Sequence, residues 1–374
     1  MVSMALTGTM AVAVLAGAGT SEVKAADKAK IGVLVADVSG EEAQGFRSYY
    51  ENYIAGNYDV EFNYTDALQS AEDEKTAIEK FASQGCQAII SFSSNDRVQQ
   101  IETCEKYGVY YAVASGVLDD AQYETYKTYE YFAGQVGPGN DTEFEAGKDM
   151  GAYYKEQGVS KVAIYGAFIP NPMHVYRVAG VLNGLGCTYG GESDMNAIAG
   201  QIFQDQTVDL SKVEGDVEVV SYLQGYGDTT TDELNAAIQK TPDAFISVGM
   251  ATTFFAQSLS EAGISFSDID SFTETNGNSM KNGTLTYLAG KYSSSIGPVF
   301  ALVMNAINGN VIRDEDGNAP SISQGYLVAT DSDTFDKYSV SDSGDAPIYD
   351  KETLDSIIGD NVTFEDVKTL VESK

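Results

Sequence analysis

The sequence predicts an α/β fold made of two doubly wound, Rossmann-like lobes, each built on a parallel sheet. From residue 30 onward, short apolar runs alternate with stretches of helical periodicity. This alternation is typical of βαβ units, and near-continuous apolar strands indicate sheets covered on both faces. The chain has 374 residues, a length that favours about two domains.

The first block is expected to contain four strands separated by amphipathic helices. The expected strands are Lys30–Ala36, Asp59–Tyr64, Gln87–Phe92 and Val109–Ala114, and the expected helices span 41–55, 70–84 and 96–107. A further strand, Tyr131–Val136, leads into a Gly- and Pro-containing segment, and we place the seam between the blocks at Gly134–Asn140. The next helix is expected to begin near Thr142, with Glu145 completing a capping box.

The second block repeats the same alternation. Strands are expected at Lys161–Tyr165, Glu218–Leu223 and Ala244–Val248, and near 269–274 and 284–289, with helices at 173–186, 230–240, 252–263 and 296–309. Residues 188–215 interrupt this rhythm and are interpreted as a Gly- and Asp-rich insertion. After residue 310 the sequence is rich in turn formers, and a strand at 324–330 and short helices near 351–358 and 363–373 are expected to close the chain.

The N-terminus has the features of an export signal, which we assign to residues 1–25. Residues 4–19 are apolar and small, yet too few to cross a bilayer, which needs about 20 apolar residues. Val23-Lys24-Ala25 supplies the small residues of a cleavage site. Leu15-Ala16-Gly17-Ala18-Gly19 resembles a lipoprotein signal with Ala18 in place of the lipidated cysteine, which leaves open whether the protein is released or is a variant of an anchored one. An extracytoplasmic location is predicted.

Composition excludes several classes of function. The net charge is −33 and no basic run exists, which argues against nucleic acids and anionic membranes as partners. His174 is the single histidine, so multi-histidine metal sites are excluded and no cofactor is expected. Cys86, Cys104 and Cys187 lack metal-ligand spacing and are expected to be buried thiols, with a Cys86–Cys104 disulfide as the alternative.

Motifs of catalysis are missing from the sequence. There is no Walker A loop and no G-x-S-x-G elbow. The glycines Gly184, Gly186 and Gly190 end a predicted helix instead of following a strand, so they fail the context required of a dinucleotide loop. Binding without catalysis is therefore predicted.

Polar residues gather where the predicted strands end, which is where ligands bind in open α/β sheets. They include Asp37, Ser93, Asn95, Ser115, Asn171, His174, Arg177, Gln224, Tyr226, Asn276 and Lys291. Hydroxyls, amides and a few charges suit hydrogen bonding to a polyol, and Phe168, Tyr226 and Tyr292 could supply flat stacking faces. The alternative for each residue is a helix cap or turn former, since Ser, Asn and Asp favour both.

Several segments resemble type I periplasmic sugar-binding proteins. Ala71–Gly85 followed by Cys86–Ser91 is similar to their helix and following strand, and Tyr107–Val113 is similar to the next strand. Arg177–Val181, Thr275-Asn276-Gly277 and Ile296-Gly297 match further segments. The resemblance covers roughly residues 29–310, and Pro347–Lys374 looks like the extended C-terminus of some members.

This resemblance implies the type I periplasmic-binding-protein fold, with a three-segment hinge that closes over a solute. The implied N-terminal lobe comprises 29–135 and 292–322, and the implied C-terminal lobe comprises 136–291 and 323–374. By position, the first lobe would contribute Asp37, Ser93, Asn95 and Ser115, and the second His174, Arg177, Tyr226, Asn276 and Lys291. The resemblance also implies an ABC permease as partner and a monomer.

Two departures weaken the inference of a simple sugar. Ser115 stands where the family usually has Asp, and Gly249-Met250 stands where it usually has Asn-Asp. The predicted function is therefore an importer's solute-binding protein, with a sugar as the first choice. A modified sugar, a nucleoside or amino-acid-like solute, a sensor subunit for a membrane receptor, and an exported hydrolase stay as alternatives.

Overall fold

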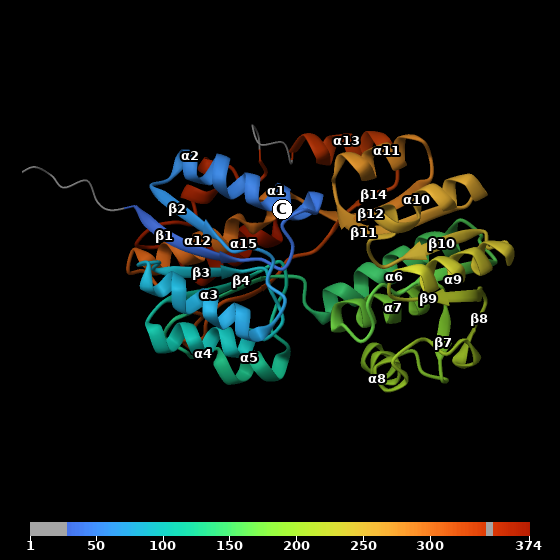
Figure 1. Cartoon of the computed structure of the whole chain (residues 1–374), viewed down its shortest axis with the longest axis horizontal. Helices are drawn as coiled ribbons and strands as arrows, with labels where there is room; N and C mark the ends of the chain where they lie inside the picture. Colours follow the sequence, from blue (N-terminus) through green and yellow to red (C-terminus); the bar gives the residue numbers. More distant parts are fainter. Residues whose placement is uncertain (1–27, 342–346) are drawn as a thin grey trace, which may run out of the picture.

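The computed structural model describes residues 28–341 and 347–374, and it forms two lobes joined side by side (Figure 1). The expected signal peptide, with Ala18, lies outside the described residues. The first lobe is built on six parallel strands in the order β13-β5-β4-β3-β1-β2. Their bounds are Ala29–Leu34 (β1), Val60–Tyr64 (β2), Ala88–Ser91 (β3), Tyr110–Ala114 (β4), Phe132–Gly137 (β5) and Ser321–Ser323 (β13).

The second lobe repeats this plan with the order β14-β12-β11-β10-β6-β9. Five of its strands are parallel, and β14 pairs antiparallel with β12. The bounds are Lys161–Tyr165 (β6), Glu218–Leu223 (β9), Ala244–Ser247 (β10), Ser265–Ser271 (β11), Leu285–Lys291 (β12) and Leu327–Ala329 (β14). The predicted pair of doubly wound lobes is thus confirmed.

Helices cover both faces of each sheet. Those of the first half are Glu41–Ser48 (α1), a π-helical stretch at Tyr49–Ile54, Ala55–Asn57 (α2), Ala71–Ser83 (α3), Arg97–Tyr107 (α4), Asp120–Tyr126 (α5) and Asn140–Glu156 (α6). The others are Pro172–Gly184 (α7), Met195–Asp205 (α8), Asp228–Gln239 (α9), Ala251–Ala262 (α10), Glu274–Lys281 (α11), Gly297–Ile307 (α12), Ser332–Ser341 (α13), Lys351–Asp355 (α14) and Phe364–Glu372 (α15).

The segment interpreted as an insertion has its own structure. It contains α8 and a two-stranded antiparallel sheet of β7 (Cys187–Tyr189) and β8 (Val213–Gly215). Tyr189 anchors it, since its hydroxyl donates to Asp205 at 2.7 Å and accepts from the Asp209 amide at 2.9 Å. The irregular composition of this segment therefore marks short elements joined by turns.

The expected capping box at Thr142 is wrong. Helix α6 begins two residues earlier, with Gly139 as an N-cap that has no side chain to accept a bond. Thr142 lies inside the first turn, where its hydroxyl is 2.6 Å from that of Ser323, and Glu145 accepts instead from Lys148. Thr142 therefore links α6 to the end of β13.

The expected assignment of residues 323–374 to the second lobe is wrong for the C-terminal part. Strand β14 and helix α13 belong to the second lobe, but α14 and α15 pack on the first. Leu354, Val367 and Val371 lie in the same apolar core as β1 and α12, and Asn305 of α12 bonds the tail backbone. An apolar side chain is buried wherever a complementary core exists, and sequence order does not decide which lobe supplies it.

Helices α6 and α7 approach unusually closely because glycines line their contact. A Cβ on Gly180 would lie 2.0 Å from the Phe144 carbonyl oxygen, and one on Gly147 would lie 2.0 Å from that of Arg177. Gly151 and Gly184 make equivalent approaches. The second lobe therefore starts from a tightly packed helix pair directly after the first crossover between the lobes.

The three cysteines are buried free thiols, as predicted, so the alternative Cys86–Cys104 disulfide does not form. Within residues 28–341 and 347–374, no helix is long and apolar enough to cross a membrane.

Candidate ligand site between the lobes

The carboxyl ends of the two parallel sheets face each other across the junction of the lobes. Lys291, at the end of β12, donates to the Ser115 hydroxyl just after β4, with Nζ and Oγ 3.0 Å apart. Ser271, at the end of β11, donates to Glu42 of α1 at 2.7 Å, and Thr275 of α11 donates to Glu41. This edge is where ligands bind in open α/β sheets.

Backbone strain concentrates at the same edge. Five described residues other than glycine have positive φ, and three of them lie within three residues after a strand: Ser115 (56°) after β4, Ala167 (51°) after β6 and Met250 (69°) after β10. Such conformations cost of order 1–3 kcal/mol each and persist at sites where function requires them. The strain therefore marks the interlobe edge as a candidate site.

Ser93 and Asn95 belong to a loop that a buried glutamate organises. Glu74 of α3 is fully buried and accepts bonds from the Ser93 hydroxyl and the Asn95 and Asp96 amides. Ser93 is thereby committed to the scaffold, whereas Asn95 reaches solvent. Sequence reasoning missed Glu74, although it stands on the apolar face of its helix with Ile78 and Phe81, an unusual place for a carboxylate.

Asp37 shapes the turn between β1 and α1. Its carboxylate accepts from the Ser39 amide at 2.8 Å, the Ser39 hydroxyl at 3.1 Å and the Gly40 amide at 3.0 Å. These bonds, led by that of the Ser39 backbone, hold the pKa of Asp37 below its usual value. Asp37 is exposed and ionised at the cleft edge, so it can accept hydrogen bonds from a solute.

His174 and Arg177 are both buried, at 5% exposure, beside Gly249 after β10. Burial, and then the charge of Arg177, lowers the pKa of His174 to about 3, so the imidazole is neutral. Arg177 is engaged on three sides: Nε to Glu143 at 2.6 Å, Nη1 to the Val248 carbonyl at 2.8 Å, and Nη2 to the Tyr326 hydroxyl at 2.6 Å. These bonds brace the end of β10 and the hinge.

An exposed aromatic cluster stands at the ends of β6, β9 and α10. The Tyr226 side chain is 69% exposed, its ring lies parallel to Phe254 within 9°, and Phe168 meets it edge-on at 5.6 Å. Tyr226 and Phe168 were predicted as stacking faces, and Phe254 was missed because it lies one turn inside its helix. Flat exposed rings of this kind can stack on the apolar face of a ring-shaped solute.

Asn276 and Lys291 are the remaining predicted residues. Asn276 is 1% exposed, and its amide donates to the Ser271 carbonyl at 2.8 Å while its Oδ1 is buried without a partner. Lys291 lies between the lobes. Asp37, Ser115 and Lys291 therefore lie at the facing strand ends, and Ser93, His174, Arg177 and Asn276 are buried; contact of any of them with a solute stays a prediction.

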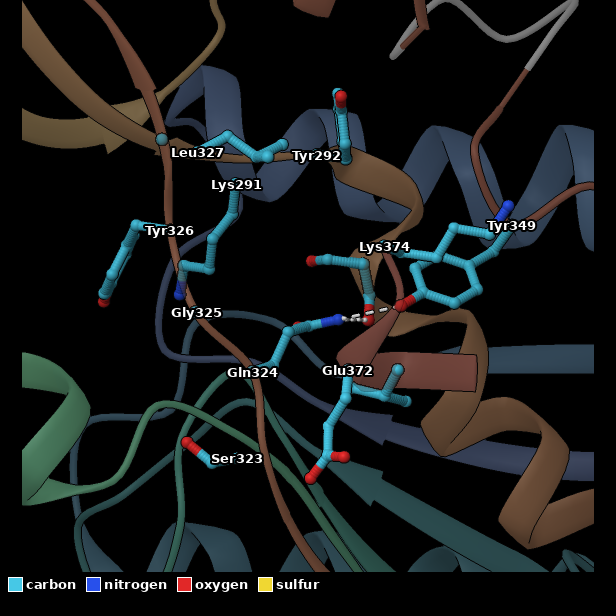
Figure 2. Close-up of a pocket in the computed structure, with 13 residues that line it drawn as sticks. Lys291, Tyr292, Ser323, Gln324, Gly325, Tyr326, Leu327, Tyr349, Glu372 and Lys374 are labelled. Atoms are coloured by element: carbon cyan, nitrogen blue, oxygen red, sulfur yellow. Dashed lines mark hydrogen bonds between the residues drawn. The ribbon is translucent and has the colours of Figure 1, made fainter. Parts of the chain in front are cut away.

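A cavity of about 320 Å³ lies at the hinge, beside the cleft edge (Figure 2). The hinge segment Ser323–Leu327, Lys291 and the C-terminal tail line it. Gln324 holds this wall together by donating to the Ser295 carbonyl at 3.1 Å and the Tyr349 hydroxyl at 3.4 Å. Among the described residues, no cluster of His, Cys, Asp or Glu has the arrangement of a metal site.

The sequence matches no protein-family model and no curated protein sequence. Solved structures do match. An allose-bound ABC transporter periplasmic solute-binding protein from Actinobacillus succinogenes aligns with a TM-score of 0.63 at 16% identity, over 83% of this chain and 100% of the other.

Two further solved structures are similar. The arabinose-transporter binding protein of Shewanella gives a TM-score of 0.59 at 16% identity, covering 84% of this chain and 96% of its own. The Caulobacter myo-inositol-binding protein gives 0.58 at 13% identity, covering 82% and 95%. These likenesses confirm the predicted type I periplasmic-binding-protein fold.

Proposed function

We propose that this protein is an extracytoplasmic solute-binding protein of an ABC importer, and that it captures a small polar solute, a sugar in the first place, between its lobes without chemical change. One observation carries the proposal: the polar strand ends of the two lobes face each other, and the Lys291–Ser115 bond links them. Proteins of the same fold bind arabinofuranose, allose and myo-inositol, all of them polyols.

The aromatic cluster and the Asp37 carboxylate suit different parts of a polyol. Tyr226, with Phe254 behind it, offers an exposed flat face for the C–H surface of a ring. Asp37 offers carboxylate oxygens that accept from hydroxyls. A polyol can use both features, whereas a purely apolar ligand has no hydrogen-bond donor to offer the carboxylate.

Hinge closure would bury the solute. The chain passes between the lobes after β5, after β12 and between β13 and β14, so three short segments can absorb a rotation. The Ser271–Glu42 and Thr275–Glu41 bonds lie on one side of the cleft and would form or break with that rotation. A membrane permease is the partner that such a closed form would dock on.

A thermal-shift screen with neutral sugars, nucleosides and amino acids tests binding. A ligand at about 100 times its dissociation constant should add about 2.7 kcal/mol of stability. Tyr226→Ala should weaken the affinity for the hit, while Tyr107→Ala, which removes an exposed tyrosine from the far end of α4, should not. If no small polar solute raises the melting temperature, the proposal fails.

Small-angle scattering tests closure on the same hit. The radius of gyration should fall when the solute is added, because the lobes rotate together. Cell fractionation and the mass of the mature N-terminus test export, with cleavage after Ala25 expected, and sedimentation tests the proposed monomer. An unchanged radius with a bound solute would contradict hinge closure, and a cytoplasmic, uncleaved protein would contradict the importer role.

A further inference from the structure

Two cationic side chains meet at the Ser115-Gly116 dipeptide. Lys291 reaches it from the second lobe and bonds the Ser115 hydroxyl at 3.0 Å. Arg97, the first residue of α4 in the first lobe, reaches it from the other side: its Nη2 lies 3.0 Å from the position that a Cβ on Gly116 would occupy. One cation from each lobe thus lies at this dipeptide, Lys291 at Ser115 and Arg97 beside Gly116.

Lys291 is a buried ammonium without a matching carboxylate. Its exposed fraction is 9%, and within the described part of the chain no carboxylate oxygen lies within 4.0 Å of its Nζ. Its contacts are the neutral Ser115 hydroxyl and the face of the Tyr326 ring, 5.4 Å from the ring centre. Burying a charge is costly unless an opposite charge compensates it.

Arg97, in the first lobe, is a half-buried guanidinium. Its Nη1 donates to the Val117 carbonyl at 2.6 Å, but its Nε is buried with no partner, and none of the ion pairs among the described residues includes it. Burial lowers the pKa of Arg97, and Tyr111 and Glu74 act in the opposite direction. Glu74 acts on Arg97 only through its charge, because the hydrogen bonds that it accepts come from Ser93, Asn95 and Asp96.

We propose that the interlobe solute carries an anionic group, a carboxylate or a phosphate, which binds between Lys291 and Arg97 at Ser115-Gly116. This inference rests on the proposed function and narrows the solute to an acidic polyol, such as a sugar acid or a phosphorylated sugar. The anion would accept charge-assisted hydrogen bonds from both lobes. Its binding would therefore stabilise the closed arrangement of the lobes.

Ser115 is important for this selectivity. A serine leaves the Lys291 ammonium uncompensated, whereas a carboxylate at position 115 would neutralise it and repel an anion. The protein's charge of −33 does not prevent this, because exposed charges are largely screened beyond about 8 Å at physiological salt. Solute hydroxyls would meet the Asp37 carboxylate and solute carbons the Tyr226 ring.

Titration calorimetry with matched pairs tests the inference. The probes are glucose with glucuronate and glucose 6-phosphate, galactose with galacturonate, and arabinose with arabinonate. At least one acidic member should bind at least about tenfold more tightly than its neutral parent. Whichever of glucuronate and glucose 6-phosphate binds more tightly identifies the anionic group as a carboxylate or a phosphate.

Variants separate anion binding from a simple latch between the lobes. Lys291→Met and Arg97→Met should each weaken the acidic probe at least about tenfold more than the neutral parent, while Lys291→Arg should restore most of the affinity for the acidic probe. Lys281→Met, which removes an exposed lysine paired with Asp336, is the matched control. Circular dichroism and melting establish that each variant folds.

Three outcomes overturn the inference. If neutral sugars bind as tightly as every acid, the proposed function stands and the anionic group is wrong. If Lys291→Met weakens neutral and acidic probes equally, Lys291 is a latch between the lobes. If no probe of either kind binds, the proposed sugar-binding function and the inference fall together.

Discussion

Arg177 and Glu143 form a buried ion pair inside the second lobe, with 2.6 Å between Nε and Oε2. Their side chains are only 6% and 4% exposed, and the Tyr326 hydroxyl joins them by donating to Glu143 at 3.0 Å. The pair ties α7 to α6 and to the hinge segment that carries Tyr326. Arg177, which was predicted to line the solute site, is thus bonded on three sides by protein groups.

Glu143→Ala should destabilise the protein strongly, because it leaves the Arg177 guanidinium buried and unpaired. The expected loss in the free energy of unfolding is about 3–5 kcal/mol. Glu145→Ala, on the same helix, removes an exposed partner of Lys148 and should cost less than about 1 kcal/mol. Urea unfolding measures both, and equal losses would contradict the structural role of the buried pair.

Gly180→Ala should destabilise the α6–α7 contact, because the added Cβ would meet the Phe144 carbonyl at 2.0 Å. Overpacking of this kind costs about 1–3 kcal/mol. Gly200→Ala, in the exposed face of α8 with no atom within 4 Å of the new Cβ, should instead stabilise by about 0.5–1 kcal/mol. Thermal melts that shift in the same direction for both variants would show that the two helices can separate freely.

Asp268 should make stability depend on pH. Burial, and then the neighbouring Asp270, raises its pKa above the usual 3.8, so the folded state keeps a proton that the unfolded state loses. The stabilisation that this group contributes is therefore complete below pH 3.8, and it is lost as the pH rises through the raised pKa of the folded state. Asp268→Asn cannot titrate, so its stability relative to wild type should improve between about pH 4.5 and about pH 7.5.

Urea unfolding across that range measures this difference. Asp232→Asn, on the exposed face of α9, is the control and should run parallel to wild type at every pH. In the wild type, the Thr252 amide donates to the Asp268 carboxyl group at 3.0 Å. Asp268→Asn is therefore expected to lower the free energy of unfolding overall, in addition to changing how that free energy depends on pH. If the free energy of unfolding of Asp268→Asn changes with pH as steeply as that of wild type, Asp268 is ionised in the folded state.

Leu354→Ala should loosen the first lobe selectively, because Leu354 of α14 is buried in the core of β1 and α12. The cost is about 2–5 kcal/mol, and hydrogen exchange should quicken in β1, β3 and β4. Phe335→Ala in α13 is the reciprocal variant, since Phe335 packs against Phe272 in the second lobe and its loss should loosen β11 and β12. Faster exchange in the second lobe of Leu354→Ala would contradict the placement of the tail.

The alternation of apolar runs and helical stretches determined the fold class. Strands Lys161–Tyr165 and Glu218–Leu223 were predicted to the residue, because hydrophobic periodicity is a local property of each segment. Helix α5 and helix α11 were missed, since short polar helices carry weak periodicity. The start of α6 was misplaced because Gly139 caps it without a side chain.

The polar strand ends followed from the sequence, but their orientation did not. Ser93 and His174 were predicted on the same grounds as Asp37, as polar residues that follow a strand. In the structure, Ser93 is bonded to the buried Glu74 carboxylate, and His174 is itself buried. Only the tertiary structure decided that the tail joins the first lobe, and that Lys291 and Arg97 meet at one dipeptide from opposite lobes. Each of these outcomes depends on contacts between residues far apart in the chain, which local patterns do not encode.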